Sequence, residues 1–219
     1  MDKFIDRKEA GIILAEYLKD YINLPNIIVL ALPRGGVPVA YEIVQALSVP
    51  LDILIVRKLG VPGHEELAMG AIASGDTVIF NKKLLNQLDI DQSSIDTILQ
   101  REQQELVRRE HLYRGNRNFP TLKGKTIILV DDGIATGATM QAAVSSLRKH
   151  TPASIIIAVP VAARETCEEM AKIVDQVICL MQPINLYAVG IWYENFSQVS
   201  DKEVIELLEK SNSIIKTFR

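Results

Sequence analysis

Short apolar runs and helical patterns alternate along most of the chain. The apolar runs contain many β-branched residues and few polar ones, which is typical of parallel strands covered on both faces. They occupy residues 27–32, 51–56, 126–130, 154–159 and 176–180. Amphipathic segments predict helices at 6–21 with Asp6 as the cap, at 37–47, at 138–150 and at 163–174. This order predicts an α/β domain with a central, mainly parallel sheet flanked by helices.

The segment from about 67 to 118 interrupts this alternation and reads as an insertion. Residues 69–74 and 77–80 flank a Gly-Asp pair, a pattern that predicts a β-hairpin. Residues 91–114 predict one long helix with a thin apolar stripe and a polar middle. The thin stripe favours a solvated helix with one packed side. The alternative is an arm that packs on a partner subunit.

Composition and charge narrow the function classes. The 219 residues are 48% hydrophobic and 23% charged, which suits one globular domain over 1–219. With 24 basic and 27 acidic residues the net charge is −3, which argues against a dedicated nucleic-acid binder but not against a small anionic ligand. The apolar runs are too short to span a membrane. We expect a cytoplasmic protein whose Cys167 and Cys179 are reduced thiols, with a disulfide between them as the alternative.

The segment 128–140 carries the most chemistry. Its predicted strand ends in the adjacent carboxylates of Asp131 and Asp132, and a loop of small residues and a helix follow. Backbone N–H groups at such a loop can surround a phosphate, and Gly137 lets the backbone approach closely. Carboxylates repel phosphate, so the acid pair suits sugar hydroxyls or a cation. The segment therefore predicts a sugar-phosphate site, and neither a Walker A motif nor a dinucleotide fingerprint competes with it.

This segment resembles the phosphoribosyl-pyrophosphate (PRPP) signature of the type I phosphoribosyltransferases. Asp131 and Asp132 match the family's acidic pair, and its 5′-phosphate loop is matched by Ala135, Thr136, Gly137, Ala138 and Thr139. The resemblance implies that the acids bind the ribose hydroxyls, with Mg²⁺ held mainly through PRPP and near both acids. It also implies the type I fold: a core from about 25–60 and 120–182, and a small hood from about 1–22 and 183–219.

Two upstream segments resemble the family's pyrophosphate elements. Arg34, Gly35 and Gly36 follow the first predicted strand and match its pyrophosphate loop. The resemblance leaves open whether the Pro33–Arg34 peptide bond is cis, as related enzymes often have it, or trans. Arg57 and Lys58 follow the second predicted strand and resemble a basic pair of the adenine-specific branch, where a flexible catalytic loop follows.

The resemblance therefore implies a pyrophosphate role for both basic residues. The catalytic residues that it implies are Asp131, Asp132 and Lys58. The flexible loop corresponds to 60–66, and its His64 belongs either to the closed site or to a solvent-facing surface.

The C-terminal segment 186–196 is similar in layout to the hood of purine-type enzymes. Trp192 and Tyr193 are the implied base-binding residues. In a strand they would point to opposite faces, so only one could stack on a base, and Trp192 is favoured. The alternative is that both rings pack the hood. The strand after the signature helix leads into 160–163 without the lysine of 6-oxopurine enzymes, which argues against hypoxanthine and guanine.

These features imply a PRPP-dependent phosphoribosyltransferase, a glycosyltransferase that uses Mg²⁺ and releases pyrophosphate. Its partners would be PRPP and a small nitrogenous base that the motifs do not specify, and a homodimer is an open alternative to a monomer. The competing hypothesis is a non-catalytic sensor of PRPP or nucleotides, because the fold also hosts regulators. A hydrolase of ribose phosphates is a third.

Overall fold

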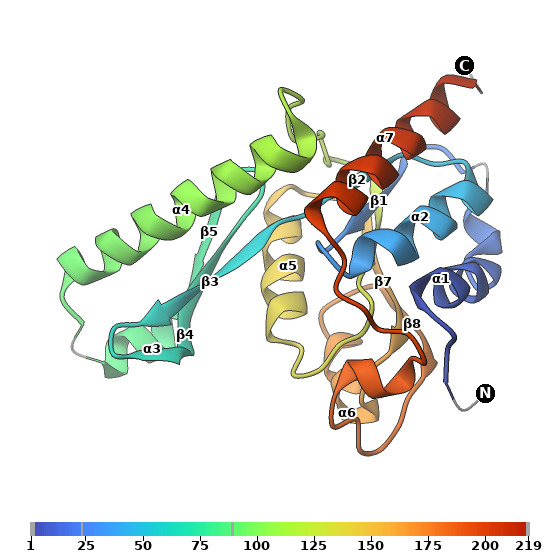
Figure 1. Cartoon of the computed structure of the whole chain (residues 1–219). Coiled ribbons are helices and arrows are strands. Elements are labelled where there is room, and N and C mark those ends of the chain that lie inside the picture. The colour runs from blue at the N-terminus through green and yellow to red at the C-terminus, as the bar shows by residue number, and fades with distance from the viewer. Residues whose placement is uncertain (1–2, 23, 89, 218–219) are drawn as a thin grey trace.

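A five-stranded parallel sheet forms the centre of the fold (Figure 1). In the computed structural model, which describes residues 3–22, 24–88 and 90–217, the strand order is β2-β1-β6-β7-β8 and every neighbouring pair is parallel. The bounds are β1 Ile27–Ala31, β2 Leu51–Ile53, β6 Thr126–Val130, β7 Ser154–Val161 and β8 Gln176–Met181. The predicted strands other than 51–56 are confirmed to within a residue or two.

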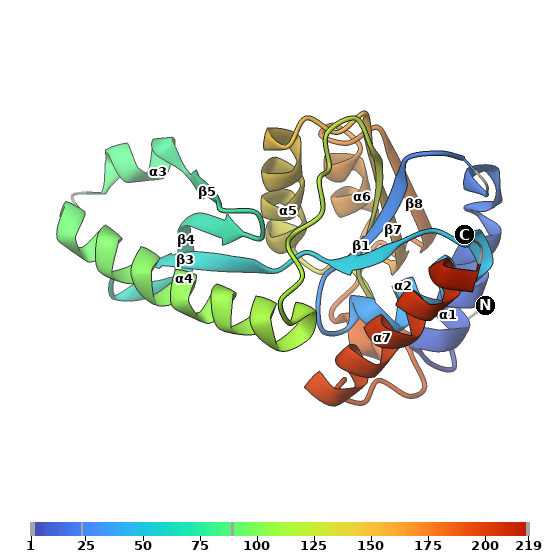
Figure 2. The ribbon, with the colours of Figure 1, turned by 90° about the horizontal axis from the view of Figure 1, so that it is seen from above.

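Helices cover both faces of this sheet, as Figure 2 shows from above. Along β6, Ile128 and Val130 face one apolar core, while Ile127 and Leu129 face the other. The first face carries α1 (Arg7–Glu16), α2 (Gly36–Leu47) and α7 (Asp201–Thr217), and the second carries α5 (Ala138–Lys149) and α6 (Arg164–Met170). The predicted α/β sheet flanked by helices is therefore confirmed. Burial on both faces explains why the strands read as unbroken apolar runs.

Two predicted helices end earlier than expected. The helix predicted to reach Tyr21 ends at Glu16, and a short 3₁₀ turn, η1 (Lys19–Tyr21), follows it. Asp6 caps α1 as predicted, because its carboxylate accepts a hydrogen bond from Glu9 N at 2.9 Å. The helix predicted to reach 174 ends at Met170 and continues only as turns.

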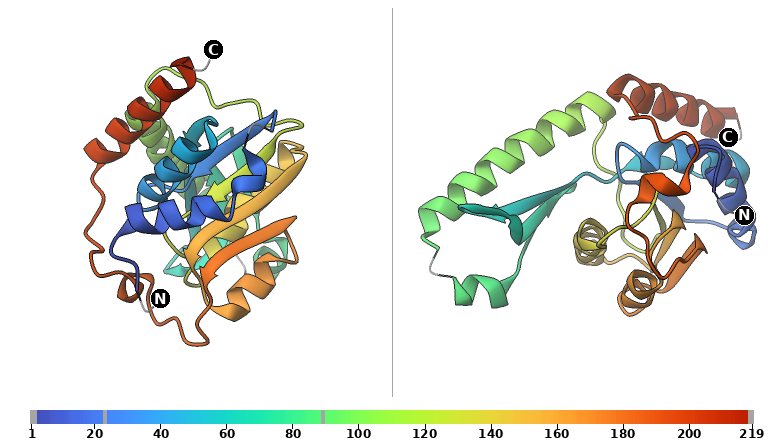
Figure 3. Two further views of the ribbon diagram at one scale, coloured as in Figure 1. Left: turned by 90° about the vertical axis from the view of Figure 1, so that its right-hand side faces the viewer. Right: turned by 60° about the horizontal axis from the view of Figure 1, so that its bottom comes forward.

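A second, antiparallel sheet and two helices form an arm that projects from the core (Figures 1 and 3). The sheet has the order β3-β4-β5, and Asp91 caps the long helix through Ser94 N at 2.9 Å. The predicted hairpin and long helix are confirmed, whereas α3 was not foreseen. The arm consists of β3 Val56–Val61, β4 His64–Ala73, β5 Thr77–Phe80, α3 Lys82–Gln87 and α4 Gln92–Arg114.

The prediction of one strand over 51–56 was wrong. The chain leaves the central sheet after Ile53 and enters the arm sheet at Val56. Leu54 and Ile55 are buried at this junction, and the Ser74 hydroxyl accepts a hydrogen bond from Ile55 N at 3.1 Å. The apolar run at 51–56 is therefore not one strand. Its first part belongs to the central sheet, its middle to the buried junction, and its last residue to the arm sheet.

The expected flexible loop at 60–66 is a strand pair. β3 and β4 are joined by a tight turn at Gly63, whose φ is +74°, so Arg57 and Lys58 lie within a strand rather than after one. His64 is exposed at the start of β4, and the side chain of Glu66 lies outside the described residues. The segment that the resemblance implied to be a flexible loop is thus the tip of an antiparallel hairpin, whose register shifts at Leu59/Gly60 and at Gly60/Val61.

For 91–114 we expected a solvated helix with one packed side, and in α4 a charged residue of the polar middle is also buried. Glu102 is buried, and it accepts hydrogen bonds from Arg57 Nε at 2.9 Å and Nη2 at 2.5 Å. Arg101 Nε contacts its other oxygen at 3.1 Å. Because a buried carboxylate needs a cationic partner, this ion pair fixes α4 across the arm sheet.

The N-terminal segment pairs with the segment that precedes α7, beside the carboxyl ends of the central strands. Phe4 forms a parallel bridge with Tyr193: Phe4 N donates to Trp192 O at 2.9 Å, and Glu194 N donates to Phe4 O at 2.8 Å. The ends of the expected hood, residues 1–2 and 218–219, lie outside the described residues.

Candidate functional site

The central sheet has a topological switch point between β1 and β6. From β1 the chain crosses to β2 on one side, while from β6 it crosses to β7 on the other. The loops that follow β1 and β6 therefore diverge and leave a crevice at the carboxyl ends of two adjacent strands. Open α/β sheets bind ligands at such points. The two most informative sequence motifs, 34–36 and 131–139, are these two loops.

The two loops are in direct contact. A Cβ atom on Gly36 would lie 2.7 Å from Val130 O, and one on Gly35 would lie 2.5 Å from Asp132 Cγ and closer still to Oδ2. At Gly36 the overlap is with backbone atoms, so only glycine fits, whereas at Gly35 the Asp132 side chain would have to move. The Pro33–Arg34 peptide bond just before them is cis, which confirms that alternative. The structure thus places the predicted pyrophosphate loop against the predicted acid pair.

The two carboxylates of the pair have different surroundings. Asp131 lines a cavity of about 200 Å³ together with 133–140 and Val189, whereas Asp132 is not among its lining residues. Asp131 also accepts a hydrogen bond from Asp132 N at 2.9 Å. Burial and the neighbouring Asp132 charge raise the pKa of Asp131 well above its usual range. Of the two acids, Asp131 is therefore the one that borders the space where a ligand could bind.

The Asp132 carboxylate lies against Gly35 and also contacts the N-terminal helix. Its Oδ2 accepts a hydrogen bond from Arg7 Nε at 2.8 Å, and both side chains are largely buried. Burial raises the pKa of Asp132, and the Arg7 charge opposes that rise. Sequence analysis missed Arg7 because the two residues are 125 positions apart and Arg7 belongs to no motif.

The predicted phosphate loop has the expected backbone form. Gly137 has φ +78°, a conformation that glycine adopts without strain, and α5 begins at Ala138. The first N–H groups of a helix have no partner within it, and the first residues of α5, 138–140, line the same cavity as the loop. Thr136 and Thr139 are exposed, so their hydroxyls are accessible. Hood residue Val189 borders the same cavity and packs on Gly133.

The predicted pyrophosphate cations have different surroundings. Arg34 Nη1 lies 3.6 Å from Asp201 Oδ1, at the start of α7, and Arg57 is held by Glu102. Lys58 lines a groove of about 270 Å³ between the arm sheet and α5. Ala138 and Thr139 line both this groove and the phosphate-loop cavity. Of the two basic arm residues, Lys58 thus lines a groove that adjoins the predicted phosphate loop. Arg57 instead contacts Glu102 within the arm.

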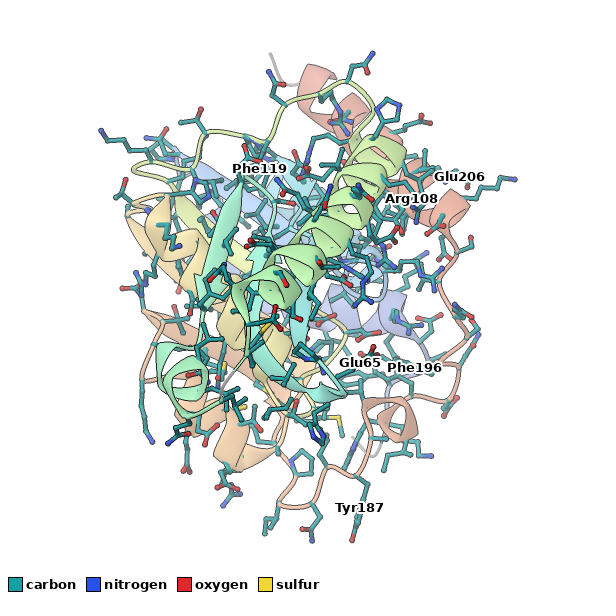
Figure 4. All side chains as sticks on the ribbon, turned by 90° about the vertical axis from the view of Figure 1, so that its left-hand side faces the viewer. Glu65, Arg108, Phe119, Tyr187, Phe196 and Glu206 are labelled. Carbon is teal, nitrogen blue, oxygen red and sulfur yellow. The ribbon has the colours of Figure 1, made fainter. Side chains whose placement is uncertain are left out.

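The two hood aromatics do not belong to one strand, so the argument from opposite strand faces does not apply to them. Trp192 ends a 3₁₀ turn, η2 (Val189–Trp192), and its Nε1 donates to Leu186 O at 3.2 Å. Tyr193 is buried, and its hydroxyl donates to Asp132 O at 2.6 Å. Burial raises the pKa of Tyr193 well above its usual range, which keeps the hydroxyl a donor. The hood aromatic that points outward is instead Tyr187, which is 88% exposed (Figure 4).

The residues at the acid pair suit a metal ion that a ligand brings with it. Within the described ranges, no group of three or more His, Cys, Asp or Glu side chains could hold a metal on its own. Mg²⁺ is commonly held by one or two carboxylates together with substrate phosphates. Asp131 and Asp132 are two such carboxylates, so they suit the expected Mg²⁺ that is held mainly through PRPP. No helix among the described residues is long and apolar enough to cross a membrane.

Replacing Gly35 with alanine tests the contact between the two loops. Gly35 has φ −60° and ψ −34°, so alanine costs no backbone strain, and any loss comes from overlap with Asp132. We expect unfolding free energy to fall by about 1–3 kcal/mol in a denaturant titration. In an Asp132→Ala background the same change should cost little, because the overlapping atoms are gone. Equal costs in both backgrounds would contradict this contact.

Comparison with known proteins gives a consistent result. The family model described as "Phosphoribosyl transferase domain" matches residues 5–194. Proteins from two strains of Mycobacterium tuberculosis, whose names assign a phosphoribosyl transferase activity provisionally, are 40% identical over 212 residues, or 97% of this chain. The chain spans about half the length of these curated relatives, 48%. The crystal structure of TT1426 from Thermus thermophilus is similar, with a TM-score of 0.84, 38% identity, and coverage of 95% of this chain and 98% of that one.

Proposed function

The chain belongs to the phosphoribosyl transferase domain family and has the type I fold, and from this premise we propose that it transfers the phosphoribosyl group of PRPP to a nitrogenous base. In the proposed reaction the bond between ribose C1′ and the pyrophosphate oxygen breaks, and a bond from C1′ to a base nitrogen forms. Pyrophosphate leaves with the bonding electron pair, and the base loses a proton. The observation that carries the proposal is the meeting of the acid pair, the phosphate loop and the 34–36 loop at the switch point.

Each part of the crevice suits one part of PRPP. The 5′-phosphate would accept hydrogen bonds from the N–H groups of 135–139, where the start of α5 favours an anion. The ribose hydroxyls would donate to Asp131, the carboxylate that lines the cavity. Positive charge grows on the ribose ring as pyrophosphate departs, and fixed carboxylates nearby stabilise it. The order along the crevice thus matches the order of groups in the substrate.

The pyrophosphate would lie against the loop of Arg34, Gly35 and Gly36. The glycines bring backbone close to the acid pair, and Arg34 contributes a guanidinium group suited to phosphate. Mg²⁺ bound through the pyrophosphate oxygens would supply further positive charge to the leaving group. Lys58 borders the groove next to the phosphate loop, so it suits the pyrophosphate role better than Arg57, which Glu102 holds.

The base would lie under the hood, on the side of the cavity that Val189 borders. The segment after β7 carries no lysine, which supports a base other than hypoxanthine or guanine. Tyr193 is held behind the acid pair, so the exposed Tyr187 and the partly buried Trp192 are better suited to contact a base. A nitrogen heterocycle without a 6-oxo group is therefore the proposed acceptor class.

Pyrophosphate release provides the direct test. The protein would be incubated with PRPP, Mg²⁺ and each of a panel of purine and pyrimidine bases. We expect base-dependent release with one or a few acceptors, and release slower by about 100-fold or more when Asp131 and Asp132 are both replaced by asparagine. Release that needs no base would instead indicate hydrolysis of a ribose phosphate. Absence of release with every base would contradict the proposed transfer.

A sensor that binds PRPP without turnover is the second candidate. The observation in its favour is that two cations expected at the pyrophosphate contact carboxylates instead, Arg57 with Glu102 and Arg34 with Asp201. Calorimetry separates the two functions, because a sensor would bind PRPP with Mg²⁺ present while releasing no pyrophosphate with any base.

A further inference from the structure

Arg7 joins three parts of the molecule that are far apart in sequence. Its Nε donates to Asp132 Oδ2 at 2.8 Å, and its Nη1 donates to Ser197 O at 2.8 Å. Its guanidinium carbon lies 3.9 Å from the centre of the Phe196 ring. The first turn of α1 is thereby connected both to the acid pair and to residues 196–197, which follow η2.

The same hood segment contacts Asp132 a second time. The Tyr193 hydroxyl donates to Asp132 O at 2.6 Å, and the Tyr193 ring packs between Phe4 and Phe196, with ring centres 5.4 and 5.0 Å apart. Asp132 is therefore held at its side chain by Arg7 and at its backbone by Tyr193. The Asp131 side chain instead accepts a hydrogen bond from the backbone of its neighbour, Asp132 N.

We propose that Arg7 is a positioning residue and that the two acids have divided roles. Arg7 holds the Asp132 carboxylate on the hood side, and Asp131 is the carboxylate that meets the ribose hydroxyls. The observations that carry this are the Arg7 contacts and the cavity that Asp131 lines and Asp132 does not. The proposal rests on the proposed function, because it assigns the ribose as the ligand of Asp131.

The physical consequence of losing Arg7 is a buried carboxylate without its cationic partner. Such a group is unfavourable where it is, so it turns toward other donors or toward solvent. Asp131 and Gly35 are the immediate neighbours of Asp132, so its movement displaces both the ribose-facing acid and the pyrophosphate loop. Arginine suits this role because one planar guanidinium can donate in two directions while stacking on a ring.

Three variants test the proposal. Arg7→Met removes the contacts, Arg7→Lys keeps the charge but cannot make both hydrogen bonds and the stack, and Lys8→Met removes one exposed charge from the same helical turn. We expect Arg7→Met to weaken PRPP binding by roughly 10- to 100-fold in calorimetry with Mg²⁺. Arg7→Lys should fall between Arg7→Met and wild type, and Lys8→Met should stay within about twofold of wild type.

Steady-state kinetics separates positioning from a general loss of folded protein. A smaller folded fraction lowers apparent kcat and leaves KM for PRPP unchanged, whereas a misplaced acid pair raises KM and lowers kcat. Arg7→Met with PRPP affinity and KM equal to those of Lys8→Met would overturn the proposal. Full recovery by Arg7→Lys would also overturn it, because charge alone would then be sufficient.

Hydrogen exchange decides the role of Arg7 even if wild type binds no PRPP, a result that would contradict only the proposed function. In the free protein, Arg7→Met should speed exchange at residues 189–197 by roughly tenfold relative to Lys8→Met, because the hood loses its connection to Asp132. Asp132 should also occupy a different position in a crystal structure of Arg7→Met. Unchanged exchange and an unchanged Asp132 side chain would overturn the positioning role.

Discussion

The double variant Asp131→Asn with Asp132→Asn is expected to lose about 100-fold or more of its turnover with PRPP, the order found when one preorganised electrostatic element is removed. Asparagine has nearly the same shape as aspartate, so the fold should persist while the negative charge beside the ribose disappears. Asp131 lines the cavity and accepts a hydrogen bond from Asp132 N, and a carboxylate has further lone pairs for hydroxyl donors. Pyrophosphate release measures the loss.

The single variants provide the matched comparison. If the roles are divided, Asp131→Asn should account for most of the loss in PRPP affinity, whereas Asp132→Asn should mainly loosen the contact with Arg7. Circular dichroism and thermal unfolding establish that each variant is folded. Near-normal turnover in the double variant would refute catalysis by the acid pair. If the double variant also bound PRPP normally, the pair would have no role in either candidate function.

Gly137→Val is expected to abolish phosphate binding at the loop. Gly137 has φ +78°, and a Cβ there would lie 3.2 Å from both Met170 Cε and Thr166 Cγ2, so a branched side chain displaces the loop that starts α5. Wild-type crystals grown in sulfate or phosphate should contain an anion at 135–139, and Gly137→Val crystals should not. Calorimetry with PRPP should show a matching loss of affinity.

Gly124→Val is the control for backbone strain. Gly124 has φ +70°, a Cβ there would meet open space, and it lies before β6 rather than after it. This variant should lose stability comparably but bind PRPP like wild type. Unchanged PRPP affinity in Gly137→Val, or an equal loss in Gly124→Val, would contradict the assignment of 135–139 as the phosphate loop.

The local sequence was sufficient wherever a short segment carries its own physical signal. Continuous β-branched runs indicate strands buried on both faces, and a capping aspartate marks the start of a helix, as at Asp6 and Asp91. The loop at 131–139 is similarly self-contained, because a strand end, a glycine with positive φ and a helix start are adjacent in the chain. The fold class and the position of this loop were therefore predictable.

Resemblance to a family assigned roles to loops, which the local signals cannot do. It was less accurate where this chain departs from the family's layout. It matched Arg34, Gly35 and Gly36 to a loop that the structure places against the acid pair. It also implied a flexible loop at 60–66, where β3 and β4 pair in a hairpin. An inserted arm changes the surroundings of those residues without changing the residues themselves.

Only the tertiary structure determined which charged and aromatic side chains meet. Arg57 forms an ion pair with Glu102, and the Tyr193 hydroxyl donates to Asp132 O, and sequence analysis predicted neither contact. The pairing of Arg7 with Asp132 joins positions 125 residues apart. Periodicity reports which face of an element is buried, but it carries no information on which distant partner neutralises a buried charge. That choice depends on how helices and strands pack together, and here it decides how the two acids of the site differ.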